Sequence, residues 1–373
     1  MPLVLVDLLS YTGTKGGMET YARELYREIG RMDTPYEFVG FASRELMTKD
    51  HSWFPGEVVD SGYSGENRVV WAYGELVGVG KGATRLGADV IHCPATLGPR
   101  RTSVPTVITM HDMLYFSHPQ LMSTPLYTEP VKWMEKQAAR NATRILTDSE
   151  SSAAEIRKFL GFDASRLEVV PLAGTPASGT VPTDLTRRPG LVIAVGNRRP
   201  HKNWEGLVRA LPYVDEAIRP TLVVTGSHGD DPLRPVVAEL GLEPWVDLRT
   251  WVSAEELDEL YATASILAMP SFCDGFCLPA LEAMMVGLPV MLSDIPVYRE
   301  VAADAGLYFD PHDHRSIARA ITRAVTEPEL LARLTAEGYE QAARFSWRQA
   351  AEQTLAAFDT AIAEYPALAA RRR

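Results

Sequence analysis

Residues 265–294, "SILAMPSFCDGFCLPALEAMMVGLPVMLSD", carry the pattern that decides the fold. A short apolar run, 265–270, precedes a loop and then an apolar segment that is punctuated by Pro279 and Gly287. Proline is favoured in the first turn of a helix, and glycine favours its end. A second apolar run follows at 289–294. The stretch therefore predicts a buried strand, a loop, a helix and another buried strand, which is one repeat of a parallel α/β sheet.

The same alternation of apolar runs and helical patterns extends over most of the chain. Strand-helix-strand alternation predicts parallel sheets that are wrapped by helices, so the fold class is α/β with two successive Rossmann-like sheets. The strands of the first half are expected at 3–9, 36–42, 89–93, 106–110, 144–148 and 167–172. Those of the second half are expected at 190–196, 221–226, 245–251, 265–270, 289–294 and 306–311.

The domain organisation follows from length and from one interruption of this pattern. A chain of 373 residues exceeds the usual size of a single domain. Residues 173–190 are rich in Gly, Pro, Ser and Thr and have no periodicity, which is typical of a linker. We expect domains at 1–175 and 188–345, a linker at 176–187, and an amphipathic C-terminal helix and tail at 346–373.

Charge makes nucleic acid and membranes unfavoured partners. The formal net charge is −11, whereas nucleic-acid binding requires a basic face. The same charge weakens a model of electrostatic docking on a membrane, although peripheral contact stays possible. Local basic groups occur at Arg100–Arg101 and at 371–373, and we interpret them as a solvated loop and a frayed terminus.

The cysteines and the N-terminal sequence favour a soluble cytoplasmic protein. Three cysteines cannot all pair, and the spacing of Cys273 and Cys277 matches neither a redox motif nor a zinc site. Reduced thiols are therefore expected. The opening "PLVLVDLLSY" lacks the features of a signal peptide, and no apolar run is long enough to span a bilayer.

Ligands of parallel sheets bind where strands pass into helices, so these junctions hold the candidate site residues. Gly16 and Gly17 precede the first helix, where their amides can approach a ligand or simply form a flexible turn. His111 and Asp112 follow a strand, and the histidine can donate to a substrate hydroxyl or cap its own loop. The glycines of 78–83, "GVGKGA", follow a helical pattern, and we interpret their likeness to a dinucleotide fingerprint as a coincidence.

A cluster of cations follows the first strand of the second half. Arg198, Arg199 and Lys202 lie between this strand and a helix that starts near Asn203. Cations at a helix N-terminus oppose the helix dipole unless an anion binds there. A diphosphate would resolve that conflict by accepting charged hydrogen bonds.

The opening stretch supplies two carboxylates at another junction. Asp274 lies on the loop, and Glu282 lies near the start of the helix. The amides of residues 275–278 are placed to meet phosphate oxygens, and a carboxylate can accept hydrogen bonds from the two hydroxyls of a ribose. The alternative is that both carboxylates only complement the helix dipole.

The combination of motifs resembles the retaining glycosyltransferases of family four, which have the GT-B fold. The stretch that begins "PSFCDGFCLPALEAMMVGLPV" is similar to the donor-site block of that family, which carries an E-x7-E pair. Other segments follow in family order: "GGMETYARE", "MHDMLYFSHP", "TDSESSAAEI", "VVPLAG", "VGNRRPHKNW" and "VSAEELDELYATA". The resemblance implies two Rossmann-like domains with a central cleft and a C-terminal helix that crosses back to the first domain.

The resemblance also implies an activity. A hexose-type sugar would move from a nucleotide-diphosphate sugar, such as a UDP- or GDP-sugar, to a hydroxyl of a small molecule, a saccharide or a polysaccharide precursor, with retained configuration. Neither a cofactor nor a metal would be required, because protein cations neutralise the diphosphate. The alternatives are a nucleotide-sugar epimerase or a phosphorylase on the same architecture, and a non-catalytic binding protein.

Residue roles follow from matching positions. The resemblance implies catalytic roles for His111, Lys202, Arg198 and Asp274. It implies donor contacts by Gly16, Gly17, Asn197, Gly275, Phe276, Cys277, Leu278 and Glu282. Three positions depart from the family pattern: Asp274 is one methylene shorter than the usual glutamate, Cys277 replaces a glycine, and Asn197 replaces an arginine. Either Arg198 or Arg199 is then the second cation, and the first two departures are expected to affect the choice of sugar.

Overall fold

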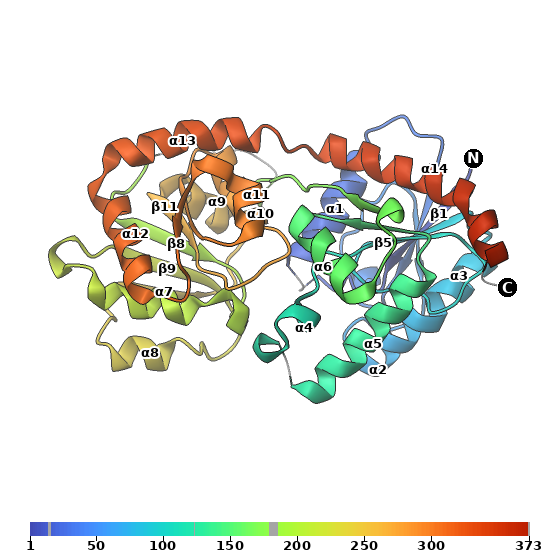
Figure 1. The fold of residues 1–373 in the computed structure, drawn as a ribbon, viewed down its shortest axis with the longest axis horizontal. Helices are drawn as coiled ribbons and strands as arrows, with labels where there is room; N and C mark the ends of the chain where they lie inside the picture. Colours follow the sequence, from blue (N-terminus) through green and yellow to red (C-terminus); the bar gives the residue numbers. More distant parts are fainter. Residues whose placement is uncertain (14–15, 123, 179–185, 372–373) are drawn as a thin grey trace. The chain divides into compact units, whose positions relative to one another are not determined.

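The structure is a computed structural model that describes residues 1–13, 16–122, 124–178 and 186–371. The chain divides into two compact units (Figure 1). Unit 1 comprises Met1–Pro119, Ser123–Leu172 and Ser346–Arg373, and unit 2 comprises Gln120–Met122 and Ala173–Phe345. Most of the predicted linker, residues 179–185, lies outside the described residues, so the linker stays a prediction.

Unit 1 is built on a parallel sheet. In the described residues this sheet has seven strands in the order β3-β2-β1-β4-β5-β6-β7. The chain therefore reverses its direction of winding between β1 and β4, and such a switch point is where ligands bind in open α/β sheets. The strands are β1 (Leu3–Leu8), β2 (Glu37–Ala42), β3 (Glu57–Asp60), β4 (Val90–Cys93), β5 (Thr106–Thr109), β6 (Arg144–Thr147) and β7 (Leu167–Val169).

Helices pack around this sheet. They are α1 (Gly17–Ile29), α2 (Arg68–Tyr73), the π-helix η2 (Gly74–Gly78), α3 (Val79–Leu86), α4 (Leu114–Ser117), α5 (Pro125–Asn141), α6 (Glu150–Leu160) and α14 (Trp347–Arg371). Local chemistry explains the ends of α6, where the Ser149 hydroxyl accepts from the Ser152 amide and Gly161 adopts a left-handed conformation. The glycines of "GVGKGA" lie in η2 and α3, which confirms that they do not form a nucleotide loop.

Unit 2 repeats the architecture. In the described residues its parallel sheet has the order β10-β9-β8-β11-β12-β13, so its switch point lies between β8 and β11. The strands are β8 (Leu191–Val195), β9 (Thr221–Ser227), β10 (Val246–Thr250), β11 (Ile266–Met269), β12 (Val290–Ser293) and β13 (Gly306–Phe309). The helices are α7 (Trp204–Ala210), α8 (Arg234–Glu239), α9 (Ala254–Thr263), α10 (Leu278–Met285), α11 (Pro296–Ala302), α12 (His314–Thr326) and α13 (Pro328–Ala342).

Short 3₁₀ turns connect these elements. They are η1 (Leu46–Thr48), η3 (Pro119–Leu121), η4 (Ala164–Arg166), η5 (Pro200–Lys202), η6 (Leu211–Tyr213), η7 (Glu216–Ile218) and η8 (Ala303–Ala305). The turn η5 follows β8 at the switch point of unit 2 and contains one of the predicted site residues, Lys202.

The predicted α/β fold class with two parallel sheets is confirmed. Every strand that the sequence predicts is present within a few residues of its expected bounds. The sequence missed β3, an edge strand whose one partner in the described part of the chain is β2 and whose side chains are exposed or half-buried. It therefore lacks the continuous apolar run that marks a strand buried on both faces.

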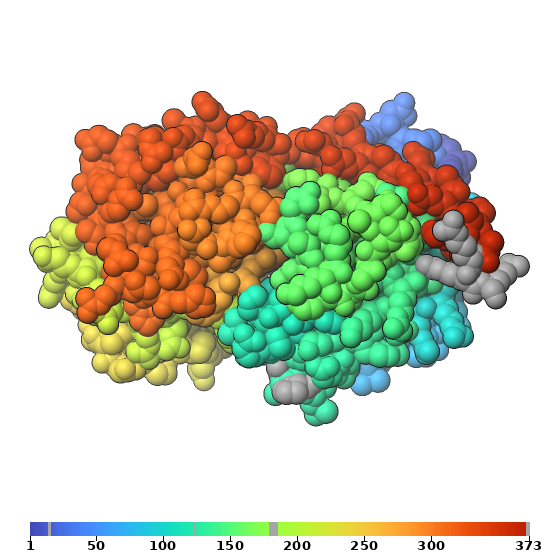
Figure 2. Space-filling view, viewed as in Figure 1, coloured from blue at the N-terminus to red at the C-terminus, as the bar shows by residue number. Residues whose placement is uncertain are grey.

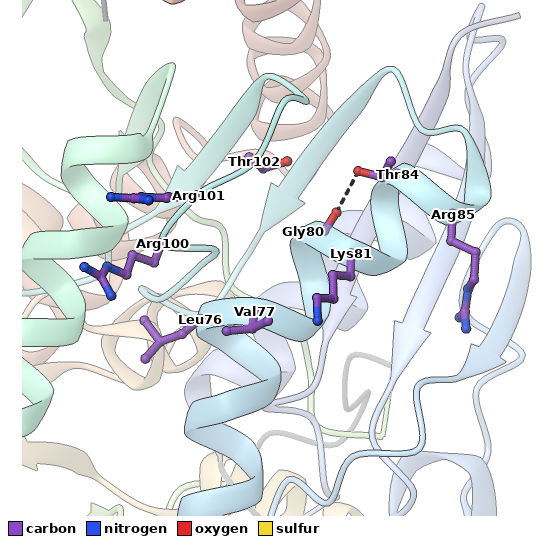
Figure 3. A pocket seen from close by; sticks show the side chains of 9 residues that line it. All are labelled: Leu76, Val77, Gly80, Lys81, Thr84, Arg85, Arg100, Arg101 and Thr102. Carbon is purple, nitrogen blue, oxygen red and sulfur yellow. Dashed lines mark hydrogen bonds between the residues drawn. The ribbon is translucent and has the colours of Figure 1, made fainter. Parts of the chain in front are cut away.

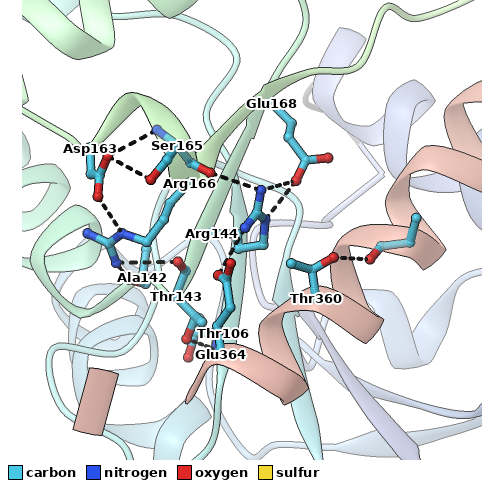
Figure 4. Close-up of polar contacts among 11 residues, drawn as sticks. Thr106, Ala142, Thr143, Arg144, Asp163, Ser165, Arg166, Glu168, Thr360 and Glu364 are labelled. Carbon is cyan, nitrogen blue, oxygen red and sulfur yellow. Dashed lines mark hydrogen bonds and ion pairs between the residues drawn. The ribbon is translucent and has the colours of Figure 1, made fainter. Parts of the chain in front are cut away.

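The C-terminal helix α14 belongs to unit 1, as expected, although it follows unit 2 in the sequence. It packs against α1, and its surface is visible in red in Figure 2. Figure 4 shows one polar anchor, in which Arg144 of β6 bonds Glu168 and, at 2.9 Å, Glu364 of α14. A second anchor is the hydrogen bond of 2.5 Å from the Tyr36 hydroxyl to Asp359.

Candidate active site

Two predicted site residues meet at the switch point of unit 2. Lys202 ends the turn η5 after β8, and Asp274 lies in the loop after β11. Because β8 and β11 are neighbouring parallel strands, their following loops lie side by side. The Lys202 Nζ lies 2.6 Å from Asp274 Oδ2, and the two side chains are 17% and 13% exposed. The structure thus places one cation and one carboxylate in contact where a parallel sheet binds ligands.

Neighbouring hydroxyls hold the Asp274 carboxylate in place. The Tyr298 hydroxyl of α11 lies 2.9 Å from Oδ2, and the Ser271 hydroxyl lies 3.4 Å from it. Tyr298 is fully buried, and burial followed by the charge of Asp274 raises the pKa of its phenol well above the ordinary value. It is therefore a neutral donor. Among the described residues no hydrogen bond reaches Oδ1, so this oxygen is open to a ligand hydroxyl.

The helix α10 starts directly after this loop. Cys277 is its N-cap, and Phe276 is half-buried, with its ring packed edge-to-face against Phe345. Burial, and then the charge of Asp274, raise the pKa of the Cys277 thiol to about 12, so it stays protonated. Gly275 and Leu278 flank these residues on the loop and in the first turn of the helix. Cys277 thus presents a small apolar side chain beside Asp274 and is not a nucleophile.

Glu282 lies one turn into α10 and is half-buried. Its Oε2 accepts a hydrogen bond of 2.9 Å from the hydroxyl of Tyr261, a buried residue of α9. Gly174 approaches the same turn so closely that a Cβ there would lie 3.0 Å from the Glu282 amide. The sequence did not single out Tyr261 or Gly174. Their segments, "DELYATA" and "VVPLAG", belong to the family order, but nothing in the spacing indicates a contact with Glu282.

The structure assigns Arg198 a different place from the predicted one. Its guanidinium pairs with Asp231 at 2.8 Å, and both side chains are nearly buried, at 7% and 4% exposed. Its other N–H groups donate to the backbone carbonyls of Gly196, Val224 and Thr225. All five of its donors are therefore used within the protein. The predicted direct contact with phosphate does not fit this geometry, and Arg198 instead fixes the loop that leads to Lys202.

The rest of this loop is also held by the fold. Asn197 is exposed, its carbonyl accepts from the Trp204 indole at 2.7 Å, and its side chain accepts from the Arg199 amide. Asn203, in a left-handed conformation, donates to the Pro270 carbonyl at 3.1 Å and so ties the loop to the end of β11. The Arg199 side chain is exposed.

In unit 1, the glycines and His111 occupy the carboxyl ends of the strands. Gly16 is the N-cap of α1 with φ 66° and ψ −129°, a conformation that only glycine adopts readily, and Gly17 begins the helix. Residues 14–15 lie outside the described residues. Glu19 in the first turn accepts the amides of Thr12 and Gly13 at 2.6 and 2.9 Å and so fixes the start of the loop.

His111 is held at both ring nitrogens. Its Nδ1 lies 2.7 Å from Asp148 Oδ2, and its Nε2 lies 2.9 Å from the Pro94 carbonyl. Both partners are acceptors, so a ring that satisfies both carries two protons. Burial alone would lower the pKa of His111, but the charge and hydrogen bond of Asp148 raise it above the ordinary value. The side chain of the neighbouring Asp112 instead accepts from the Leu114 amide, at the start of α4, at 3.0 Å.

A buried carboxyl pair in unit 1 was missed by the sequence analysis. Asp7 at the end of β1 and Glu75 in η2 are both almost fully buried, and the Ser10 hydroxyl donates to Glu75 at 3.1 Å. Burial, followed by the charge of Asp7, raises the pKa of Glu75 well above the ordinary value. The signal was hidden because Asp7 stands inside an apolar run and Glu75 inside a helical pattern.

Neither a metal site nor a membrane span emerges from the described part of the chain. No group of three or more His, Cys, Asp or Glu residues there is arranged to hold a metal ion. None of the helices searched there combines the length and the apolar character that crossing a bilayer would require.

Both units match known protein families. The family described as Glycosyltransferase Family 4 matches residues 15–173, and the family described as Glycosyl transferases group 1 matches residues 183–341. The chain is 32% identical over 285 residues to O-antigen chain mannosyltransferase B of Escherichia coli, covering 72% of this chain and 74% of that protein.

Solved structures agree on the fold. Sucrose-phosphate synthase from Thermosynechococcus elongatus superposes with a TM-score of 0.77 and 20% identity, covering 97% of this chain and 99% of that chain. The Anabaena protein HepE in complex with UDP-glucose gives a TM-score of 0.73 with 17% identity, covering 95% and 98%. At these identities the likeness establishes the fold alone.

Proposed function

The chain belongs to glycosyltransferase family 4, and from this premise we propose that it transfers a hexose from a nucleotide-diphosphate sugar to an acceptor hydroxyl with retained anomeric configuration. As a group 1 glycosyltransferase it uses a nucleotide sugar. The finer assignment rests on one observation, the contact between Lys202 and Asp274 at the switch point of unit 2. It combines a cation for a phosphate with a carboxylate oxygen for a sugar hydroxyl.

Each group near this contact has a distinct part in holding the donor. Lys202 supplies a charged donor to the diphosphate, and Arg199 supplies the second cation. Asp274 accepts a sugar hydroxyl through Oδ1. Glu282, whose position is fixed by Tyr261, accepts the hydroxyls of the ribose. The proposal thus replaces Arg198 with Arg199, because Arg198 has no donor left for a phosphate.

The same residues explain how the reaction is promoted. The bond between the anomeric carbon and the phosphate oxygen breaks, the acceptor oxygen bonds to that carbon on the same face, and the acceptor proton passes to the leaving phosphate. Negative charge grows on the diphosphate as the bond breaks, and fixed cations stabilise that charge. The role of His111 beside the transferred sugar stays a prediction, because both of its ring nitrogens are engaged within unit 1. We propose that neither a metal nor a cofactor takes part. Turnover that persists in EDTA would support the proposal that no metal takes part.

The donor sugar can be narrowed to a short panel. The E. coli relative is named a mannosyltransferase, and HepE was solved with UDP-glucose. We therefore propose UDP- and GDP-linked glucose and mannose as the first donors to test. A saccharide acceptor is the matching proposal, because the E. coli relative is named for an O-antigen chain.

A binding screen followed by turnover tests this function. Thermal shifts are measured with UDP, GDP and their sugars, because a ligand that binds the folded state stabilises it. Release of nucleoside diphosphate is then followed with candidate acceptors for the wild type, Lys202→Ala and Glu282→Ala. We expect both variants to melt normally and to lose turnover. Normal turnover in both would refute the site, and donor consumption without an acceptor would indicate an epimerase or a hydrolase instead.

A further inference from the structure

A surface groove of unit 1 lies apart from the groups proposed for sugar transfer. It has a volume of about 580 Å³ and runs between η2 and α3 on one side and the loop 100–102 on the other. Figure 3 shows that Lys81 and Arg85 come from α3 and that Arg100 and Arg101 come from the facing loop. The apolar side chains of Leu76 and Val77 complete the wall. The groove thus combines four cations with an apolar lining.

The concentration of positive charge is unusual for this chain. The protein has a formal net charge of −11, yet no carboxylate lines the groove. Within the described residues, none of these four cations forms an ion pair, whereas many other arginines pair with a carboxylate. The sequence favoured a solvated loop for Arg100–Arg101 because it could not show that α3 brings two more cations opposite them. Four unpaired cations around one hollow indicate an anionic partner.

Exposed apolar side chains continue from the groove. Arg100 stacks over the ring of Trp133 on α5 at 5.7 Å, and Trp133 is 45% exposed. Leu126 stands seven positions earlier on the same helix, hence on the same side, and is 89% exposed. Both α5 and the segment of α2 and α3 reach the surface in Figure 2.

A second contact links α5 to α2. Arg68 lies over the Tyr127 ring at 4.5 Å. On α2, Val69 and Tyr73 are four positions apart and are 78% and 50% exposed. We call the groove cations together with Val69, Tyr73, Leu126 and Trp133 the basic-apolar face.

We propose that the basic-apolar face docks this protein on the surface of an anionic phospholipid bilayer, with lipid phosphates in the groove and the side chains of Leu126 and Trp133 among the headgroups. Cations beside exposed aromatic and aliphatic residues are the composition that binds such an interface. A soluble anion would be satisfied by the cations and would leave the apolar side chains without a partner. The contact is peripheral, since none of the described helices is suited to cross a bilayer.

Sedimentation with vesicles tests this docking without reference to sugar transfer. The full chain is mixed with phosphatidylcholine vesicles and with vesicles containing an equal part of phosphatidylglycerol. We expect binding only to the anionic vesicles, and weaker binding in high salt. The variant Arg100→Glu/Arg101→Glu should partition at least about 25-fold less, because each lost cation contributes about fivefold and the two added carboxylates are repelled by the anionic surface. Leu126→Ser/Trp133→Ser should also weaken binding, with little change in salt dependence.

Matched controls keep the interpretation specific. Arg234→Glu/Arg344→Glu makes the same change in net charge at two exposed arginines of unit 2 and should bind like the wild type. The thermal shift with a nucleoside diphosphate should stay the same in all variants, which shows that they are folded and that the donor site is intact. Equal binding to neutral vesicles, an equal loss in the control, no binding to either vesicle, or displacement by millimolar inorganic phosphate would overturn the proposal.

Discussion

The change Asp274→Asn separates the two functions proposed for the contact between Lys202 and Asp274, which are the binding of a diphosphate by Lys202 and the binding of a sugar hydroxyl by Asp274. It removes one negative charge and keeps the shape of the side chain. In the proposed site, Asp274 and an incoming diphosphate compete for the same ammonium group, which lies 2.6 Å from Oδ2. Without that competitor, Lys202 is available to the phosphate at all times. The variant should therefore bind a nucleoside diphosphate more tightly but use a nucleotide sugar less well.

The structure sets the size of both effects. Two unit charges about 4 Å apart at an effective dielectric constant of about 20 attract by roughly 4 kcal/mol. Desolvation cancels most of this in a partly buried pair, which leaves about 1 kcal/mol and hence about fivefold tighter binding of the diphosphate. A hydrogen bond to a charged acceptor contributes about 1.5–3 kcal/mol, against about 1 for a neutral one. The difference of about 0.5–2 kcal/mol corresponds to a loss in kcat/KM for the sugar donor of about 2- to 30-fold.

Calorimetric titration with the diphosphate and steady-state release of the same product measure the two quantities. The matched control is Asp294→Asn, which removes a charge from an exposed pair with Arg299 in the same unit and should change neither. Weaker binding of the diphosphate by Asp274→Asn, or unchanged kcat/KM, would refute the competition between carboxylate and phosphate for Lys202.

Three further changes test the surroundings of the site. Tyr298→Phe should lower kcat/KM for the donor about tenfold and leave the Kd of the bare diphosphate unchanged, because the hydroxyl contacts Asp274 and Ser271 and neither is proposed to bind the diphosphate. A parallel loss in both would instead indicate a structural role. Asp148→Asn should lower Tm most at acid pH. Asp148 raises the pKa of His111, so their pairing contributes its full stability below about pH 6.5 and loses it as the pH rises through the folded-state pKa. A decrease in Tm that does not depend on pH would contradict this pairing. The difference in Tm between Glu75→Gln and the wild type should be more positive at pH 8 than at pH 5. A glutamate whose pKa is raised in the folded state lowers stability once it ionises in the unfolded chain, above about pH 4.3, and glutamine removes this cost. An equal difference in Tm at both pH values would argue against a raised pKa of Glu75.

Much of the fold could be predicted because burial on both faces leaves a plain signal. Strands such as β1 and β11 are buried throughout, so they appear as apolar runs that need no partner to be recognised. The edge strand β3 was not predicted, because its side chains are exposed or half-buried and it has no continuous apolar run. The placement of α14 on unit 1 followed from the resemblance to a family, since its Ala-rich face does not itself identify a partner.

The candidate site was predictable only as far as the strand order allows. Loops that follow strands of one parallel sheet share an edge, so Lys202 and Asp274 could be expected near each other. Their direct contact depends on side-chain reach, which the sequence does not give. Arg198 shows the limit most clearly. Its partner Asp231 follows β9, and the three carbonyls that it binds carry no side-chain signal at all.

The shorter carboxylate at position 274 then has a physical explanation in this chain. Lys202, Tyr298 and Ser271 all approach Oδ2, and Tyr298 is a fully buried residue of α11. A glutamate would place its carboxylate one methylene farther along, where it could keep these partners only by folding back. The aspartate fits between them, and its Oδ1 stays free of partners among the described residues. In the proposed site, the reach of the carboxylate toward the sugar is therefore set jointly by Asp274 and Tyr298, so we expect a change of donor preference to require both positions to change together.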